Sequence, residues 1–148
     1  MSLQDPTQKM SKSHKSAWSR ILITDEPEEI RKKIMGAVTD PENYVSYDPL
    51  RRPGVSNLLR LMACFDKSKR TPEELGSMLS NENLDLRGLK ERVSESIVSG
   101  LGDIRDQYIR ILAADDGKFI DQVSREGAAK ARARASKTME LVRQAVGL

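Results

Sequence analysis

Two lysines and two serines near the start of the chain have the types and the spacing to bind a polyphosphate. They lie in Lys9–Ser13, a segment without apolar periodicity, which indicates a loop. Ammonium groups three residues apart can reach two oxygens of one polyphosphate, while serine hydroxyls and nearby N–H groups donate hydrogen bonds to it. The alternative is a solvated basic run without a ligand, which is the usual role of such a run.

The composition leaves few other kinds of site. Cys64 is the only cysteine, which excludes an intramolecular disulfide and a cysteine-rich zinc site. His14 is the only histidine, so a histidine-based triad or metal cluster is poorly supported, and we predict no metal site. Residues 1–15 lack the apolar stretch of a signal peptide. No apolar run approaches the roughly 18 residues of a membrane span, so we expect no membrane partner.

Both ends of the chain are basic and its centre is acidic. Residues 1–24 carry four basic side chains against one acidic, residues 125–148 carry six against two, and residues 25–124 carry 15 against 19. Partners with phosphates are therefore expected at the ends. Two arginines in the proline-rich loop 39–53 either meet phosphate or hold that loop to the acidic centre, and the second role is favoured. The candidates for phosphate contact are Arg51, Arg52, Lys130, Arg132, Arg134 and Lys137.

Apolar residues recur at helical spacing over most of the chain, and no stretch alternates as a strand would. The predicted architecture is all-α, an antiparallel bundle of four to five helices with an extended N-terminal loop segment. We place the loop segment at 1–24 and the helical domain at 25–148. The predicted helices span 26–38, 55–66, 72–80, 86–113, one or two turns within 118–125, and 128–146.

Cap signals mark the starts of three helices. Asp25 with Glu28, and Thr71 with Glu74, have the spacing of a capping box, in which each side chain satisfies a backbone N–H of the other residue. Asp85 can cap the longest helix. Residues 115–117 predict a turn, and a helix end is expected near residue 127.

The apolar stripes predict which positions are buried. Ile30, Ile34 and Val38 form the stripe of the first helix. Residues 1–23 are expected to contact phosphate rather than to pack, with Trp18 and the apolar run 21–23 attaching them to the body. The stripe of the longest helix is Leu86, Leu89, Val93, Ile97, Leu101, Ile104, Tyr108 and Ile111.

The wider sequence resembles one known family. Residues 9–13 read KMSKS, the second signature of class I aminoacyl-tRNA synthetases, and the order of the surrounding segments resembles the C-terminal part of tryptophanyl-tRNA synthetases of the bacterial and mitochondrial type. Residues 9–15 and 57–69 are most similar to fungal mitochondrial members. His14 departs from the family, which usually carries an acidic residue there. The segments are MSLQDPTQKMSKS (1–13), ITDEPEEIRKKI (23–34), AVTD (37–40), YDPLRRPGVSNLL (47–59) and EGAAKARARASKTMELVRQAVGL (126–148).

This resemblance implies a division of labour. In the family the KMSKS loop closes over ATP with its Mg²⁺ during tryptophan activation, and its lysines neutralise the triphosphate as pyrophosphate leaves. It implies Lys9 and Lys12 as the catalytic lysines, and a helical remainder that binds the anticodon of tRNA(Trp). The six basic residues named above are candidate tRNA contacts by charge placement alone, and the alternative for each is a solvated surface residue. The implied ATP-binding residues are Lys9, Met10, Ser11, Lys12 and Ser13.

The half that holds adenosine and tryptophan is absent from this sequence, so the chain alone is expected to be inactive and to bind no cofactor. The resemblance implies a homodimeric full-length enzyme, whereas we expect this chain alone to be a monomer. It implies the mitochondrial matrix, or the cytoplasm of a bacterium. The alternative function is a standalone helical RNA-binding or interaction module without catalysis.

Overall fold

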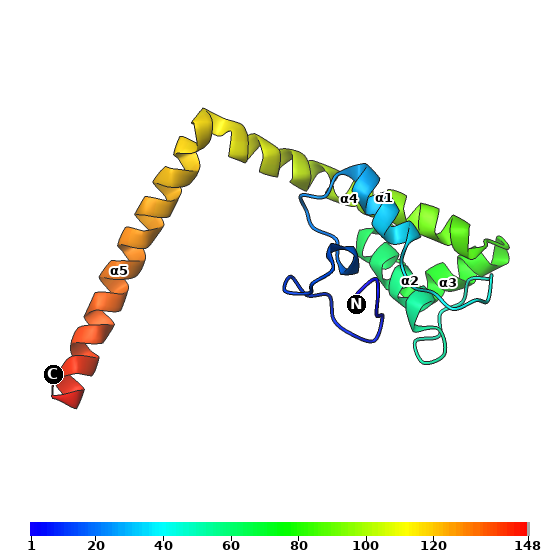
Figure 1. The fold of residues 1–148 in the computed structure, drawn as a ribbon, viewed down its shortest axis with the longest axis horizontal. Coiled ribbons are helices and arrows are strands. Elements are labelled where there is room, and N and C mark those ends of the chain that lie inside the picture. Colours follow the sequence, from blue (N-terminus) through cyan, green and yellow to red (C-terminus); the bar gives the residue numbers. More distant parts are fainter. Residues whose placement is uncertain (148) are drawn as a thin grey trace. The chain divides into compact units, whose positions relative to one another are not determined.

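The structure, a computed structural model, describes residues 1–147, and every regular element within them is helical (Figure 1). The all-α prediction is therefore confirmed. A Pro stands at or next to the start of the first three α-helices, where its missing N–H costs no hydrogen bond. The elements are η1 (Ala17–Ser19), α1 (Pro27–Met35), α2 (Pro53–Phe65), α3 (Pro72–Asn81), α4 (Leu86–Ala113), η2 (Ala114–Gly117) and α5 (Lys118–Val146).

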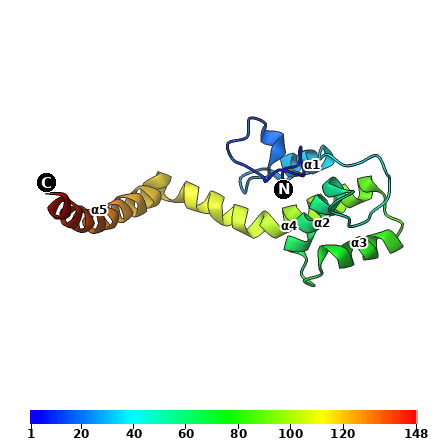
Figure 2. The ribbon, with the colours of Figure 1, turned by 90° about the horizontal axis from the view of Figure 1, so that it is seen from below.

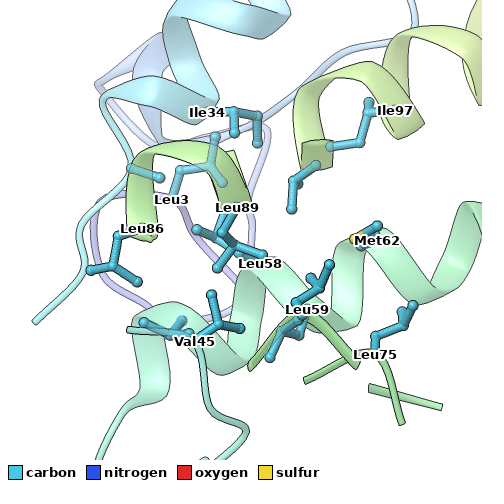
Figure 3. Packing of buried hydrophobic residues seen from close by; sticks show 14 of the residues in the cluster. Leu3, Ile34, Val45, Leu58, Leu59, Met62, Leu75, Leu86, Leu89 and Ile97 are labelled. Carbon is cyan, nitrogen blue, oxygen red and sulfur yellow. The ribbon is translucent and has the colours of Figure 1, made fainter. Parts of the chain in front are cut away.

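The chain divides into two compact units, Met1–Arg105 and a second unit that begins at Asp106. The first unit holds the hydrophobic core, to which α1, α2, α3 and the first half of α4 contribute (Figure 3). Leu3 from the N-terminal segment joins this core and is 1% exposed. The buried apolar residues are Leu3, Ile30, Ile34, Ala37, Val45, Val55, Leu58, Leu59, Met62, Leu75, Leu79, Leu86, Leu89, Val93 and Ile97.

Two of the predicted helix caps are confirmed. The Thr71 hydroxyl accepts a hydrogen bond from the Glu74 N–H at 3.2 Å, and the Glu74 carboxylate accepts one from the Thr71 N–H at 2.8 Å, which completes a capping box. The Asp85 carboxylate accepts from the Gly88 N–H at 2.7 Å at the start of α4. Local sequence was sufficient at both places because the partners lie three residues apart.

The predicted capping box at Asp25 is wrong. Helix α1 begins after Glu26, which makes no side-chain cap. Asp25 is buried and accepts instead from the Lys33 ammonium at 2.6 Å and from the Leu22 N–H at 2.9 Å. Burial acts to lower the pKa of Lys33, but the hydrogen bonds that its ammonium donates to Asp25 and Glu29 outweigh burial and raise that pKa. An ion pair in the interior therefore takes the carboxylate that the local pattern assigned to a cap.

Helix α1 also ends three residues before its predicted end. Gly36 terminates it, and Val38, predicted to be buried, is 49% exposed while Ala37 is 5% exposed. The Lys90 ammonium donates to the carbonyls of Met35 at 3.1 Å and Ala37 at 2.8 Å. A cation at these carbonyls suits the negative end of a helix, and its burial lowers the pKa of Lys90.

The second unit consists of the end of α4, η2 and α5. The turn predicted at 115–117 is confirmed, since Asp115, Asp116 and Gly117 have φ angles of 46°, 52° and 82°. The helix end predicted near Gly127 is wrong, because α5 continues from Lys118 to Val146. A glycine costs a helix only roughly 1 kcal/mol against alanine, and good helix formers surround this one. No described residue of α5 is buried, and the stripe of α4 is exposed at Ile104 and beyond.

Within residues 1–147, no helix combines the length and the apolar character that crossing a membrane would require.

Candidate nucleotide-binding loop

The loop that carries the two lysines is closed at its base by backbone hydrogen bonds. The Leu3 N–H donates to the Ser19 carbonyl at 3.0 Å, and the Ser2 N–H donates to the Gln8 carbonyl at 2.8 Å. Leu3 and Ser19 are both 1% exposed, whereas Trp18 is 51% exposed. The expectation that this segment does not pack is therefore wrong, and Leu3 has the buried position. A single leucine in a polar segment gives no periodic signal.

The helical body holds this base from two sides. The Asn57 side-chain amide of α2 donates to the carbonyls of Ser2 at 3.2 Å and Met1 at 3.3 Å. The Val38 N–H, which follows α1, donates to the Leu3 carbonyl at 2.8 Å. Asn57 is only 4% exposed. The N-terminal segment consequently lies beside α1 and α2 (Figures 1 and 2), and its polar backbone groups are satisfied there.

Short-range hydrogen bonds shape the loop after the lysines. The Ser11 hydroxyl accepts from the Ser13 N–H at 3.3 Å, and the Ser11 carbonyl accepts from the His14 N–H at 3.3 Å. The Ser16 N–H donates to Nδ1 of His14 at 3.1 Å, and Arg20 donates to the His14 carbonyl at 2.9 Å. The histidine that departs from the family pattern is thus held by groups of the loop itself.

Within residues 1–147, the structure shows no ion pair for the two lysines of the loop, Lys9 and Lys12. Both residues are exposed. Asp5, the one acidic residue nearby, accepts from the Thr7 hydroxyl at 2.6 Å and the Thr7 N–H at 3.0 Å. These hydrogen bonds lower the pKa of Asp5. The arrangement offers two free ammonium groups to a polyanion.

Met10, which lies between the two lysines, is less exposed than they are. It is half-buried and packs against the core of the first unit, while its neighbours Ser11 and Ser13 are half-buried and exposed respectively. The sequence suggested only a backbone role for this residue. Among the residues described, no cluster of three or more histidine, cysteine, aspartate or glutamate side chains is placed to hold a metal ion.

Two roles were predicted for Arg52, phosphate contact and holding loop 39–53, and its contacts favour the second. Its guanidinium is buried, donates to the Asp40 carboxylate at 2.7 and 3.1 Å, and lies 4.3 Å from the centre of the Tyr44 ring. It also donates to the carbonyls of Glu42 and Tyr44 at 2.7 and 2.8 Å and to the Ser46 hydroxyl at 3.0 Å. Five hydrogen-bonding directions of the fork are thereby used, which favours the role of holding loop 39–53.

The other predicted phosphate contacts are accessible. Arg51 is exposed in the first unit, next to the buried Arg52. The four basic residues of α5 are exposed as well, and no ion pair involves them in the part of the chain that the structure describes. The structure thus brings Lys9–Ser13 together as one loop and leaves the basic residues of α5 in a different unit. These four are Lys130, Arg132, Arg134 and Lys137.

Sequence reasoning missed the residues that hold the loop, Leu3 and Asn57. The signal for Asn57 was an amide placed among the buried apolar positions of α2, between Val55 and Leu58. A buried amide requires partners, but its partners lie 55 and 56 residues away in the chain. The pattern could therefore indicate that the Asn57 side chain forms a hydrogen bond, but not which groups accept it.

Comparison with known proteins gives a consistent result. Residues 1–102 match the family model described as tRNA synthetases class I (W and Y). The chain is 40% identical to tryptophan–tRNA ligase 1 of Streptomyces coelicolor and 38% identical to tryptophan–tRNA ligase of Enterococcus faecalis, in each case over 100% of this chain and 42% of the relative. The crystal structure of tryptophanyl-tRNA synthetase from Mycoplasma pneumoniae is similar with a TM-score of 0.69 and 29% identity, over 100% of this chain and 45% of that one.

The chain thus spans less than half of the length of the relatives it matches. The family match covers the loop and the helices of the first unit up to the middle of α4. The chain therefore belongs to the class I tRNA synthetase family of the tryptophan and tyrosine enzymes.

Proposed function

We propose that this chain is the C-terminal part of a tryptophan–tRNA ligase, in which Lys9–Ser13 is the KMSKS loop that assists ATP-dependent activation of tryptophan. The observation that carries the proposal is the pair Lys9 and Lys12, which are exposed and form no ion pair among the described residues, on a loop whose base is held by backbone hydrogen bonds. The names of the similar bacterial proteins support the choice of tryptophan. The more specific resemblance to fungal mitochondrial members, and with it a mitochondrial location, remains part of the proposal.

In the proposed step, an oxygen of the tryptophan carboxylate forms a bond to the α-phosphorus of ATP. The bond from that phosphorus to the bridging oxygen breaks, and pyrophosphate leaves with the electron pair. Lys9 and Lys12 stabilise the negative charge that grows on the leaving pyrophosphate, together with the Mg²⁺ that accompanies ATP as substrate. Neither lysine forms a covalent bond. Ser11, Ser13 and the backbone beside Met10 donate hydrogen bonds to phosphate oxygens.

The test joins this chain to the nucleotide-binding half of a relative and measures tryptophan-dependent pyrophosphate exchange. Lys12→Ala should lower the activation rate about 10²- to 10³-fold, as the loss of one preorganised charge-stabilising group does, while tryptophan affinity changes little. Lys15→Ala is the matched control, because it removes an equally exposed lysine outside Lys9–Ser13. Equal losses in both variants, or equal losses in rate and tryptophan affinity, would contradict the proposal.

The same proposal makes the isolated chain inactive and monomeric. The chain spans 42% of the length of these relatives, and in this proposal the sites for adenosine and tryptophan lie in the remainder. Pyrophosphate exchange by the 148-residue chain alone should stay at background. Sedimentation should give the mass of one chain, whereas the joined enzyme should sediment as a homodimer.

We further propose that the helical part binds the anticodon region of tRNA(Trp), with the exposed basic residues of α5 and Arg51 contacting phosphates. Binding led by phosphates weakens steeply with salt, with a slope of about −0.7 per phosphate contacted on a single strand. Lys130→Ala and Arg134→Ala should each make that slope shallower in filter binding. Arg87→Ala, which removes an exposed arginine already paired with Glu91, should not.

The alternative function, a standalone helical RNA-binding module, makes one different prediction. The module would show the same salt-dependent binding of RNA, because the basic residues of α5 are present in either case. The joined enzyme would then exchange pyrophosphate at a rate that does not depend on Lys12.

A further inference from the structure

An apolar cavity of the first unit, called the socket below, is lined in part by Met10, which is the only apolar side chain within Lys9–Ser13. The socket is a cavity of about 210 Å³. Met10 lines it and packs against the hydrophobic core. The other residues that line the cavity are Ile21, Leu22, Ile23, Leu61, Phe65, Ile97 and Leu101.

The helical body shapes this socket. Phe65 stands at the end of α2, and its ring lies against the backbone of α4 at Gly100, where an added Cβ would come within 2.1 Å of the ring. Helix α4 also contributes Ile97 and Leu101 to the wall of the socket. Only glycine at position 100 allows the Phe65 ring to lie this close to the backbone of α4. The packing of α2 against α4 thus forms one side of the socket, and residues 21–23 of the N-terminal segment complete it.

Seating Met10 changes how freely the loop can move. Between the base residues Leu3 and Ser19 lie 15 residues, which a seated Met10 divides into spans of six and eight. Shorter loops have fewer conformations. Lys9 is adjacent to the seated residue and Lys12 is two residues beyond it, so the positions of both ammonium groups follow from where Met10 sits.

We propose that Met10 is a positioning residue, whose packing against the wall of this socket fixes Lys9 and Lys12 relative to the helical body and whose withdrawal frees them. The inference rests on the proposed function for the role of the lysines. Leu3 and Asn57 at the base are buried whereas Met10 is only half-buried, which makes Met10 the contact that opens more easily. An unbranched thioether suits this role because it fits irregular cavities and has several accessible rotamers, and the free volume beside it leaves room to move.

The first test uses the 148-residue chain itself and limited trypsin digestion under native conditions. Met10→Ser should raise the rate of cleavage after Lys12 and Lys15 about tenfold, because it removes the apolar contact that holds the loop. Met10→Leu should restore the slow rate. Met35→Ser is the matched control, since Met35 is exposed on α1 outside the socket, and it should leave the rate unchanged.

Two readouts separate positioning from a loss of fold. Far-UV circular dichroism should be the same for all four proteins. The fluorescence of Trp18, the only tryptophan, should shift in Met10→Ser alone. If Met10→Ser and wild type are cleaved at the same rate and fluoresce alike, the proposal is overturned.

The second test measures pyrophosphate exchange in the enzyme joined to a nucleotide-binding half. Met10→Ser should lower kcat about tenfold, the same factor as in digestion, with KM for tryptophan unchanged and with rescue by Met10→Leu. An unchanged kcat for Met10→Ser, in an enzyme that Lys12→Ala inactivates, overturns the inference but leaves the proposed function intact. If instead Lys12→Ala has no effect, the proposed function fails, and the trypsin rates alone decide whether Met10 holds the loop.

Discussion

Two long loops of the first unit carry basic residues and use them in opposite ways. In loop 39–53 the residue Arg52 is 4% exposed, and its guanidinium donates all its hydrogen bonds to groups of the same loop. In loop 4–18, Lys9 and Lys12 are exposed, while backbone hydrogen bonds hold the base of the loop and Met10 packs against the core. A cation with saturated donors organises its own chain, whereas a cation left free on a tethered loop is available to a ligand.

Both loops depend on the start of α2. Arg52 precedes its first residue, and Asn57 lies within its second turn. Gly54 between them allows the helix to begin against the preceding chain, because a Cβ there would lie 2.3 Å from the Val38 carbonyl oxygen. One short helix therefore fixes loop 39–53 through an arginine and the base of the lysine loop through an amide.

The largest effect is expected from Arg52→Met. It removes the buried partner of Asp40, whose side chain is 22% exposed, and leaves the carbonyls of Glu42 and Tyr44 without their donor. We expect a loss of roughly 3–5 kcal/mol in the free energy of unfolding, as for a broken buried ion pair, measured by urea denaturation. Arg51→Met at the exposed neighbour should change stability by less than about 0.5 kcal/mol. If the two variants lost similar amounts of unfolding free energy, the buried Arg52 would contribute no more to stability than the exposed Arg51.

Removing the amide at the loop base gives the next largest effect. Asn57→Ala leaves the carbonyls of Met1 and Ser2 without their buried donor, which costs roughly 1–3 kcal/mol. Hydrogen exchange at the Leu3 amide should accelerate at the same time, because the base opens more often. Asn81→Ala, at an exposed asparagine of α3, is the control for both measurements. Unchanged exchange at Leu3 would mean that the base is held without α2.

Much of the helical fold could be predicted from the sequence, because helix signals are local. The capping box at Thr71 and the cap at Asp85 join residues three apart, and both are confirmed. Asp25 carried the same local signal, but a lysine eight residues away took its carboxylate. The apolar stripe of α4 was recognised along its whole length, yet its spacing could not indicate that burial stops after the part near Ile97.

The candidate site likewise contains residues that the sequence could predict and residues that it could not. Lys9 and Lys12 could be recognised because the signature is contiguous. The residues that hold the loop could not, since Leu3 is one apolar residue in a polar segment and Asn57 bonds 55 residues back. The role of Met10 depends on a cavity formed by two helices and residues 21–23, and no spacing within the loop predicts a cavity.

Lowering the pH should narrow the difference between wild type and Arg52→Met. Hydrogen bonds from Arg52 hold the pKa of Asp40 below its usual 3.8. A carboxylate with a lowered folded pKa contributes stability that is complete above its unfolded pKa and is lost as the pH falls through the folded one. The stability gap should therefore be constant from neutral pH down to about 3.8 and shrink below it, by urea denaturation at a series of pH values. A gap that widens on acidification would exclude Asp40 as the partner that matters.

The smallest effect is expected where the chemistry is proposed. Lys9→Ala and Lys12→Ala should each change the free energy of unfolding by less than about 0.5 kcal/mol, because both side chains are exposed and no ion pair involves them within residues 1–147. The measurement is the same urea series that is used for Arg52→Met. Stability and activity then separate the two loops, since Arg52→Met should lower stability and Lys12→Ala should lower pyrophosphate exchange alone. A Lys12→Ala chain destabilised as much as Arg52→Met would mean that this lysine is built into the fold, and its charge would not be free for a phosphate.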